Sequence, residues 1–217
     1  VRGTSVLTPA EVQELCGLSQ GESLLGVDVP AIEAAVASSP RVQRAQATKL
    51  LPDRLIIRLV ERAPLALVET SDGVVEISED LVVLPRAERT PLLDLPVVTG
   101  LDFTLEAGAV VDDDELVKSL DLLSRARSVS GLLWSEISEI RIAPGSGLVI
   151  YTVADGAEIR VGSGALDDSD LARLAIVLED LRARGRRIDS IDLRFEQQAI
   201  VRFRPGGAGE SAGGGFS

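Results

Sequence analysis

Apolar residues recur with a period of two at Leu55, Ile57 and Leu59, and the preceding stretch carries Val42, Ala45 and Ala47 among polar neighbours. This period is typical of strands that are buried on one face. Pro52 cannot donate a hydrogen bond to a sheet, and the side chain of Asp53 favours a turn. The pattern therefore predicts a β-hairpin that turns at Pro52. Its inward-facing residues are Val42, Ala45, Ala47, Leu55, Ile57 and Leu59.

Two helices are predicted before this hairpin. The first begins after Thr8, because Thr8 and Glu11 have the spacing of a capping box. Asp28 caps the second helix, which ends before Pro40 because the residue preceding a proline is kept out of helical conformations. With a strand expected over residues 1–7, the order of elements is β-α-α-β-β.

The end of the hairpin marks a domain boundary near Ala63. Glu61 and the residue after it are charged, and Pro64 cannot continue a hydrogen-bonded ladder, so the strand ends there. We therefore expect a first domain over residues 1–64 and a second over residues 65–204. The remainder, residues 205–217, is rich in Gly and Ser and is predicted to be a disordered tail.

The second domain is predicted to combine short strands with two helices. Both helices begin with acidic residues and end with arginines, which suits the helix dipole, and Asp155-Gly156 between two apolar runs is a hairpin signal. The fold class is therefore α+β, with a mostly antiparallel β domain after the first. Its strands are expected over 66–69, 74–77, 81–84, 137–142, 148–153, 157–161 and a closing hairpin over 188–205, its helices start near Asp112 and Asp167, and 92–100 is expected to be a connection.

Composition narrows the function classes. The net charge of −12 opposes nucleic-acid binding, because an acidic surface repels phosphate, and it also disfavours an anionic membrane surface. The chain has no apolar run of about 18 residues, the length a membrane helix needs. Since it begins at Val1 and contains no Met, we expect that a membrane anchor precedes it.

Several stretches invite a chemical interpretation. Histidine is absent, which excludes a Ser-His-Asp triad and removes the common zinc ligand. Cys16 lies on the apolar stripe of the first helix, where packing is expected rather than reactivity. Residues 112–114 are three acids that a helix start explains better than a cation site, and the glycines near 145 and 162 are expected in turns. For the arginine-rich run 182–187 we favour a helix C-terminus over contact with an acidic partner.

The order β-α-α-β-β, together with the runs VRGTSVLT, GESLLGVDVPAIEAAV, PRVQRAQATKLLPDRLIIRLVERAPLALV, LPVVTG and IDLRF, resembles the extracytoplasmic part of the FtsQ/DivIB family of bacterial division proteins. The most specific run is Glu61-Arg62-Ala63-Pro64-Leu65-Ala66. The resemblance implies that the first domain is a POTRA domain. It also implies a protein of the inner membrane with one membrane helix, whose extracytoplasmic region lies at the division septum.

The resemblance further implies a non-enzymatic scaffold without cofactor or metal that binds the FtsB/FtsL complex through its last strands. The physical mechanism would be β-augmentation, in which an exposed strand pairs with an incoming one. The residues expected to bind the partner are Arg194, Phe195, Ile200, Val201, Arg202, Phe203 and Arg204. Family resemblance also suggests a recruitment face in the first domain, formed by Arg44, Ala47 and Lys49. An outer-membrane assembly or secretion module with POTRA domains is the alternative.

Overall fold

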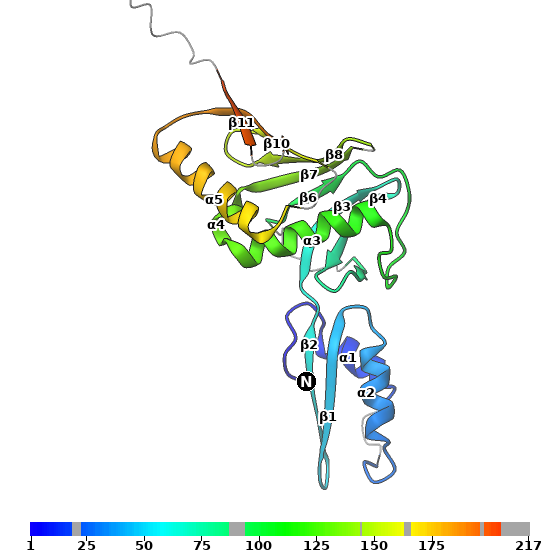
Figure 1. Ribbon diagram of the computed structural model, residues 1–217. Coiled ribbons are helices and arrows are strands. Elements are labelled where there is room, and N and C mark those ends of the chain that lie inside the picture. The colour runs from blue at the N-terminus through cyan, green and yellow to red at the C-terminus, as the bar shows by residue number, and fades with distance from the viewer. Residues whose placement is uncertain (19–22, 87–93, 144, 163–165, 196–197, 205–217) are drawn as a thin grey trace, which may run out of the picture.

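The computed structural model describes residues 1–18, 23–86, 94–143, 145–162, 166–195 and 198–204. Figure 1 shows an elongated molecule with a small N-terminal domain at one end and a larger sheet domain at the other. The predicted tail, residues 205–217, lies outside the described residues.

Two helices cover one face of a two-stranded sheet in the N-terminal domain. Thr8 and Glu11 form the predicted capping box, and Asp28 accepts a hydrogen bond from the amide of Ala31, so both predicted helix starts are confirmed. Val12, Ile32 and the inward residues of the hairpin make the core between helices and sheet. The elements are α1 (Pro9–Cys16), α2 (Val29–Ala37), β1 (Val42–Leu50) and β2 (Arg54–Glu61).

The strand predicted over residues 1–7 is reduced to a single bridge. Arg2 pairs in parallel with Arg58 of β2, its amide donates to the Ile57 carbonyl at 2.9 Å and its carbonyl accepts from the Leu59 amide at 3.1 Å. Beyond this bridge the segment is held by Glu61, whose carboxylate accepts the amide protons of Ser5, Val6 and Leu7. A side chain at the end of β2 thus replaces the backbone ladder that the sequence pattern predicted.

One mixed nine-stranded sheet forms the second domain, in the order β11-β10-β9-β8-β7-β6-β3-β4-β5. The pairs β3–β6, β6–β7 and β9–β10 are parallel and the others antiparallel. The strands are β3 (Pro64–Thr70), β4 (Gly73–Ser78), β5 (Val83–Leu84), β6 (Val97–Thr99), β7 (Ile137–Ala143), β8 (Gly147–Thr152), β9 (Glu158–Val161), β10 (Ile188–Phe195) and β11 (Gln198–Phe203).

Helices α3 (Asp114–Val129), α4 (Gly131–Glu136) and α5 (Asp168–Ala183) lie along one face of this sheet (Figure 1). Their apolar sides bury Leu116, Leu120, Leu123 and Leu171 completely against the inward residues of the strands. The sequence pattern predicted two helices here and missed the short α4. It also assigned Val97–Thr99 to a connection, although this segment is the strand β6 at the centre of the sheet.

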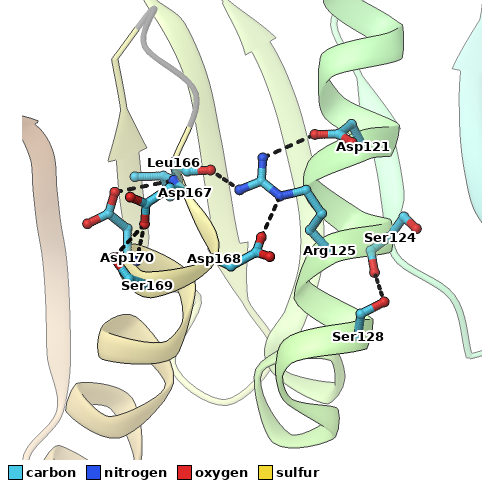
Figure 2. A network of polar contacts seen from close by, with 9 residues as sticks. All are labelled: Asp121, Ser124, Arg125, Ser128, Leu166, Asp167, Asp168, Ser169 and Asp170. Atoms are coloured by element: carbon cyan, nitrogen blue, oxygen red, sulfur yellow. Dashed lines mark hydrogen bonds and ion pairs between the residues drawn. The ribbon is translucent and has the colours of Figure 1, made fainter.

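An arginine ties the second long helix to the first. Figure 2 shows Arg125 of α3 reaching the start of α5, where Nε donates to Asp168 at 2.9 Å and Nη2 donates to the Leu166 carbonyl. Asp121, one turn earlier on α3, accepts from the same guanidinium at 3.2 Å. Because these contacts join two helices that are far apart in sequence, they fix the helical layer beneath the strands.

Of the three acidic residues 112–114, Asp113 caps the start of α3. Asp113 accepts the Leu116 amide at 2.9 Å as the N-cap. We expect Asp113→Ala to lower the free energy of unfolding by about 1 kcal/mol, because the first turn loses its capping acceptor. The exposed neighbour Asp112 is the matched control. Asp112→Ala should change the free energy of unfolding, measured by urea denaturation, by less than about 0.5 kcal/mol. Equal effects of both substitutions would contradict a capping role.

Candidate functional site

The last strand, β11, is an edge of the nine-stranded sheet, and β10 is its only neighbour among the described strands. Two large apolar side chains of β11 are exposed, Ile200 at 46% and Phe203 at 39%. An exposed edge offers backbone groups for pairing with another chain. We call Ala199–Arg204 the open edge.

Hydrogen bonding fixes which backbone groups the open edge presents. The Arg204 amide donates to the Arg187 carbonyl at 3.1 Å, so it points toward β10. Because amide directions alternate along an extended strand, the amides of Ile200 and Arg202 also face β10. Those of Val201 and Phe203 face away from the sheet and are available to an incoming strand.

Side chains of the open edge divide between the two faces of the sheet. Val201 packs against the core on the helical side. Phe203 lies beneath the guanidinium of Arg186, whose Cζ is 4.1 Å from the ring centroid. Arg204 donates to the Asp155 carbonyl at 3.1 Å. Arg202 is exposed and forms no ion pair or side-chain hydrogen bond with any residue that the structure describes.

Arg194 is engaged within the chain. It donates to both carboxylate oxygens of Asp192 on β10, at 2.9 and 2.7 Å. These hydrogen bonds lower the pKa of Asp192 to about 2, so the pair stays charged at neutral pH. Phe195 ends β10 beside Gln198 of β11. The structure therefore brings the predicted residues into one hairpin, with Arg194 held by an acidic neighbour.

The arginine-rich run 182–187 at the end of α5 includes one residue, Arg186, that the sequence pattern did not single out. Arg182 forms an ion pair with Glu136, and Arg184 pairs with Asp180 on the preceding turn at 2.9 Å. These contacts agree with the predicted helix C-terminus. Arg186, in contrast, reaches Phe203 of the open edge. Only the pairing of β10 with β11 reveals that contact, because the two residues are far apart in sequence.

The predicted recruitment residues lie on different faces of β1. Arg44 is exposed on the face opposite the helices, where it is paired with Val60 of β2. Ala47 and Lys49 lie on the helical face and are half-buried. The Ala47 amide donates to Oε1 of Glu33 from α2 at 2.7 Å. A side chain therefore occupies the middle of this sheet edge.

The structure also shows where Gly145, Gly162 and Cys16 lie. Gly145 lies in the turn between β7 and β8 with a positive φ, as predicted for this glycine. Gly162 follows β9, and residues 163–165 lie outside the described residues. Cys16 packs against the N-terminal core, and burial raises the pKa of its thiol. Within the described ranges, no helix is long and apolar enough to cross a membrane.

Comparison with known proteins assigns both domains. Residues 1–62 match the family model of the FtsQ-type POTRA domain, and residues 66–194 match that of the cell division protein FtsQ/DivIB C-terminal region. The cell division protein FtsQ of Anaeromyxobacter sp. strain K is 34% identical over 192 residues, which are 88% of this chain and 64% of that protein. FtsQ of Geotalea daltonii is 26% identical over 193 residues, 88% of this chain and 70% of its own length. The chain thus spans less than two thirds of the Anaeromyxobacter relative.

Proposed function

This chain belongs to the FtsQ/DivIB family of cell division proteins, and we propose that it is a non-enzymatic divisome scaffold whose open edge binds the FtsB/FtsL complex. The observation that carries this proposal is the edge position of β11. Its two outward amides and exposed apolar side chains suit an incoming strand. The match to the C-terminal region of the family supports this over an outer-membrane assembly or secretion module.

Charges beside the open edge indicate the side chains that a partner strand should carry. On the face opposite the helices, acidic and basic residues pair within single strands, as Glu158 does with Arg160 on β9 at 2.9 Å and Asp192 with Arg194 on β10. Asp192 also lies opposite Arg160 of the adjacent strand in the register. Arg202 lies opposite Ser190 in the register and has no acidic partner among the described residues. Since opposite charges on adjacent strands attract, a carboxylate opposite Arg202 would continue the pattern.

We further propose that the full-length protein is anchored in the inner membrane by one helix and acts at the division septum, with the region described here extracytoplasmic. The recruitment role of Arg44, Ala47 and Lys49 remains a prediction. Because Arg44 and the other two residues face opposite sides of the sheet, one flat partner surface would not contact all three.

Phe203→Pro tests the open edge directly. The Phe203 amide has no partner within the sheet, so proline removes a donor for the incoming strand while the pairing with β10 persists. We expect binding of the extracytoplasmic FtsB/FtsL pair, measured by calorimetry, to weaken more than tenfold, or by over about 1.4 kcal/mol.

Phe203→Leu is the matched control, because it keeps the amide and an apolar side chain. It should retain binding within about threefold, a loss below 1 kcal/mol. A circular dichroism melt of each variant checks that the hairpin is folded. If the proline and leucine variants bind the pair equally well, strand addition at this edge is wrong.

A further inference from the structure

The net charge of the chain is distributed unevenly between its two domains. Residues 1–62 contain seven basic and seven acidic side chains, so the whole net charge of −12 belongs to the rest of the chain. Within the N-terminal domain the two signs also separate. The described acids lie on or next to the helices, at the hairpin turn, or at Glu61, where β2 ends.

Four of the seven basic residues lie on the face of the β1–β2 sheet that the helices leave open. In the register, Arg58 lies between Arg2 on one side and Gln46 on the other, while Arg44 pairs with Val60 and Arg54 with Leu50. The residues of this face are Arg2, Arg44, Gln46, Thr48, Leu50, Arg54, Ile56, Arg58 and Val60. We call it the arginine face, and it contains no acidic residue.

The arginines of this face are exposed and unneutralised. None of the four forms an ion pair or side-chain hydrogen bond with a residue that the structure describes. Arg2, Arg44 and Arg58 surround a shallow groove of about 330 Å³, which Gly3 and Gln46 also line. Like charges directly opposite each other on neighbouring strands are destabilising, so the Arg2–Arg58 pair is explained best by an anion bound between them.

The position of Arg2 is built into the fold. Backbone hydrogen bonds to Ile57 and Leu59 place it next to Arg58. Gly3 then packs so tightly against β2 that a Cβ atom would lie 2.2 Å from the Leu59 carbonyl oxygen. Three amides bound to Glu61 hold the residues that follow. The chain thus fixes this arginine beside a second one.

The edges of the sheet exclude strand addition as the mode of binding. Arg2 covers the middle of the β2 edge, and Glu33 accepts the outward amide of Ala47 in the middle of the β1 edge. A ligand must therefore be recognised by side chains on the flat face. The Cα atoms of Arg54 and Arg58 are about 13 Å apart along the strand, and this spacing suits a surface of repeated anions.

Apolar side chains on the same face favour a lipid surface over a soluble polyanion. Val60 is 50% exposed and Leu50 45%, and Leu51 at the hairpin turn is 66% exposed. This turn lies at the end of the molecule farthest from the acidic sheet domain (Figure 1). Arginines interleaved with exposed apolar residues are typical of surfaces that bind anionic headgroups while contacting acyl chains.

We propose that the arginine face binds the phosphate headgroups of anionic phospholipids in a bilayer surface. The net charge of −12 disfavours such binding for the chain as a whole, but salt screens charges more than about 8 Å away. The charge of the arginine face itself, and not the net charge of the chain, therefore determines whether the bilayer is bound. This inference is independent of the partner proposed for the open edge.

Vesicle sedimentation tests the proposal with the 217-residue chain. We expect it to bind vesicles of phosphatidylcholine with about one quarter phosphatidylglycerol, to leave pure phosphatidylcholine vesicles unbound, and to lose binding at high salt. The double variant Arg44→Gln/Arg58→Gln should reduce partitioning about 30-fold, because each arginine near an anionic surface contributes about 1 kcal/mol.

The matched control is Arg86→Gln/Arg187→Gln, which removes the same charge from two exposed arginines of the second domain. It should keep partitioning within about threefold, a change below 1 kcal/mol. Soluble poly-glutamate and glycerol phosphate serve as competing anions. Equal loss in both double variants would overturn the proposal, as would binding of either soluble anion without binding to vesicles or the absence of any anion binding.

Discussion

Replacing Arg41 with alanine is expected to lower the free energy of unfolding by about 3–5 kcal/mol, because it breaks a buried ion pair between the domains. Arg41 is only 3% exposed. Its Nη1 lies 2.8 Å from Glu76 Oε2 on β4, and its Nε donates to the Pro85 carbonyl at 3.0 Å. Removing the guanidinium would leave the largely buried carboxylate of Glu76 and the Pro85 carbonyl without their donor.

A second arginine, Arg62, also joins the two domains at this junction. We therefore expect the loss of Arg41 to alter the orientation of the domains as well as their stability. Arg62 donates to the carbonyls of Pro40 and Val42 at 3.0 and 2.7 Å, and its Nε lies 2.7 Å from Asp80. Burial opposes the charge of Asp80, but hydrogen bonds from Ser78 and Arg62 outweigh it and lower the pKa of Asp80. The family run that includes Arg62 thus has a structural role at the boundary.

Urea denaturation and X-ray scattering test the prediction for Arg41→Ala. Arg41→Ala should reduce the unfolding free energy and broaden the distribution of interdomain distances, because the N-terminal domain is no longer fixed to β4. Arg54→Ala removes an exposed arginine from the same domain and should change stability by less than about 0.5 kcal/mol.

A double variant separates the unpaired carboxylate from the loss of the contact itself. Arg41→Met/Glu76→Leu removes both charges, and we expect it to recover part of the lost stability, since an apolar pair can replace a buried ion pair. Wild-type stability and scattering for Arg41→Ala would contradict the role assigned to the ion pair.

Local signals predicted much of this fold, because each depends on residues close in sequence. Thr8 and Asp28 are confirmed as helix caps. The two later helices begin in the predicted acidic runs, where Asp113 and Asp167 are the caps. The Asp155-Gly156 turn joins β8 and β9 as expected. In each case a short side chain or a glycine satisfies a backbone requirement within a few residues.

Elements set by distant contacts could not be predicted in this way. Residues 97–99 form too short a strand to show alternation, and only parallel pairing with β3 and β7 makes β6 a central strand. The contact of Arg186 with Phe203 and the pairing of Arg2 with Arg58 likewise join residues far apart in sequence. The family resemblance supplied the position of the candidate binding edge, while the hydrogen bond of Arg204 showed which amides it presents.

Glu61→Gln should lower the unfolding free energy at pH 7 by about 2 kcal/mol, after allowance for the partial exposure of the carboxylate. Oε2 of Glu61 accepts the amides of Ser5 and Val6 at 2.9 Å, and Oε1 accepts that of Leu7 at 2.8 Å. Glutamine keeps one acceptor and turns an NH₂ group toward the remaining donors. The N-terminal segment should therefore detach more readily, and with it Arg2.

The decrease in unfolding free energy caused by Glu61→Gln should also depend on pH. Burial opposes the charge, but the hydrogen bonds from Ser5, Leu7 and Val6 outweigh it and lower the pKa of Glu61 in the folded protein. A carboxylate with a lowered folded pKa stabilises above its unfolded pKa of about 4.3, and this stabilisation is lost as the pH falls through the folded value. The difference between wild type and variant should be full at pH 7 and diminish below about pH 4.

Urea denaturation at neutral and acidic pH measures this difference. Glu14→Gln is the matched control, because Glu14 is exposed on α1 and its carboxylate forms no ion pair or hydrogen bond with a residue that the structure describes. It should match the wild type at both pH values. A deficit in Glu61→Gln that persists unchanged at acidic pH would show that side-chain shape, and not the charge of the carboxylate, holds the N-terminal segment.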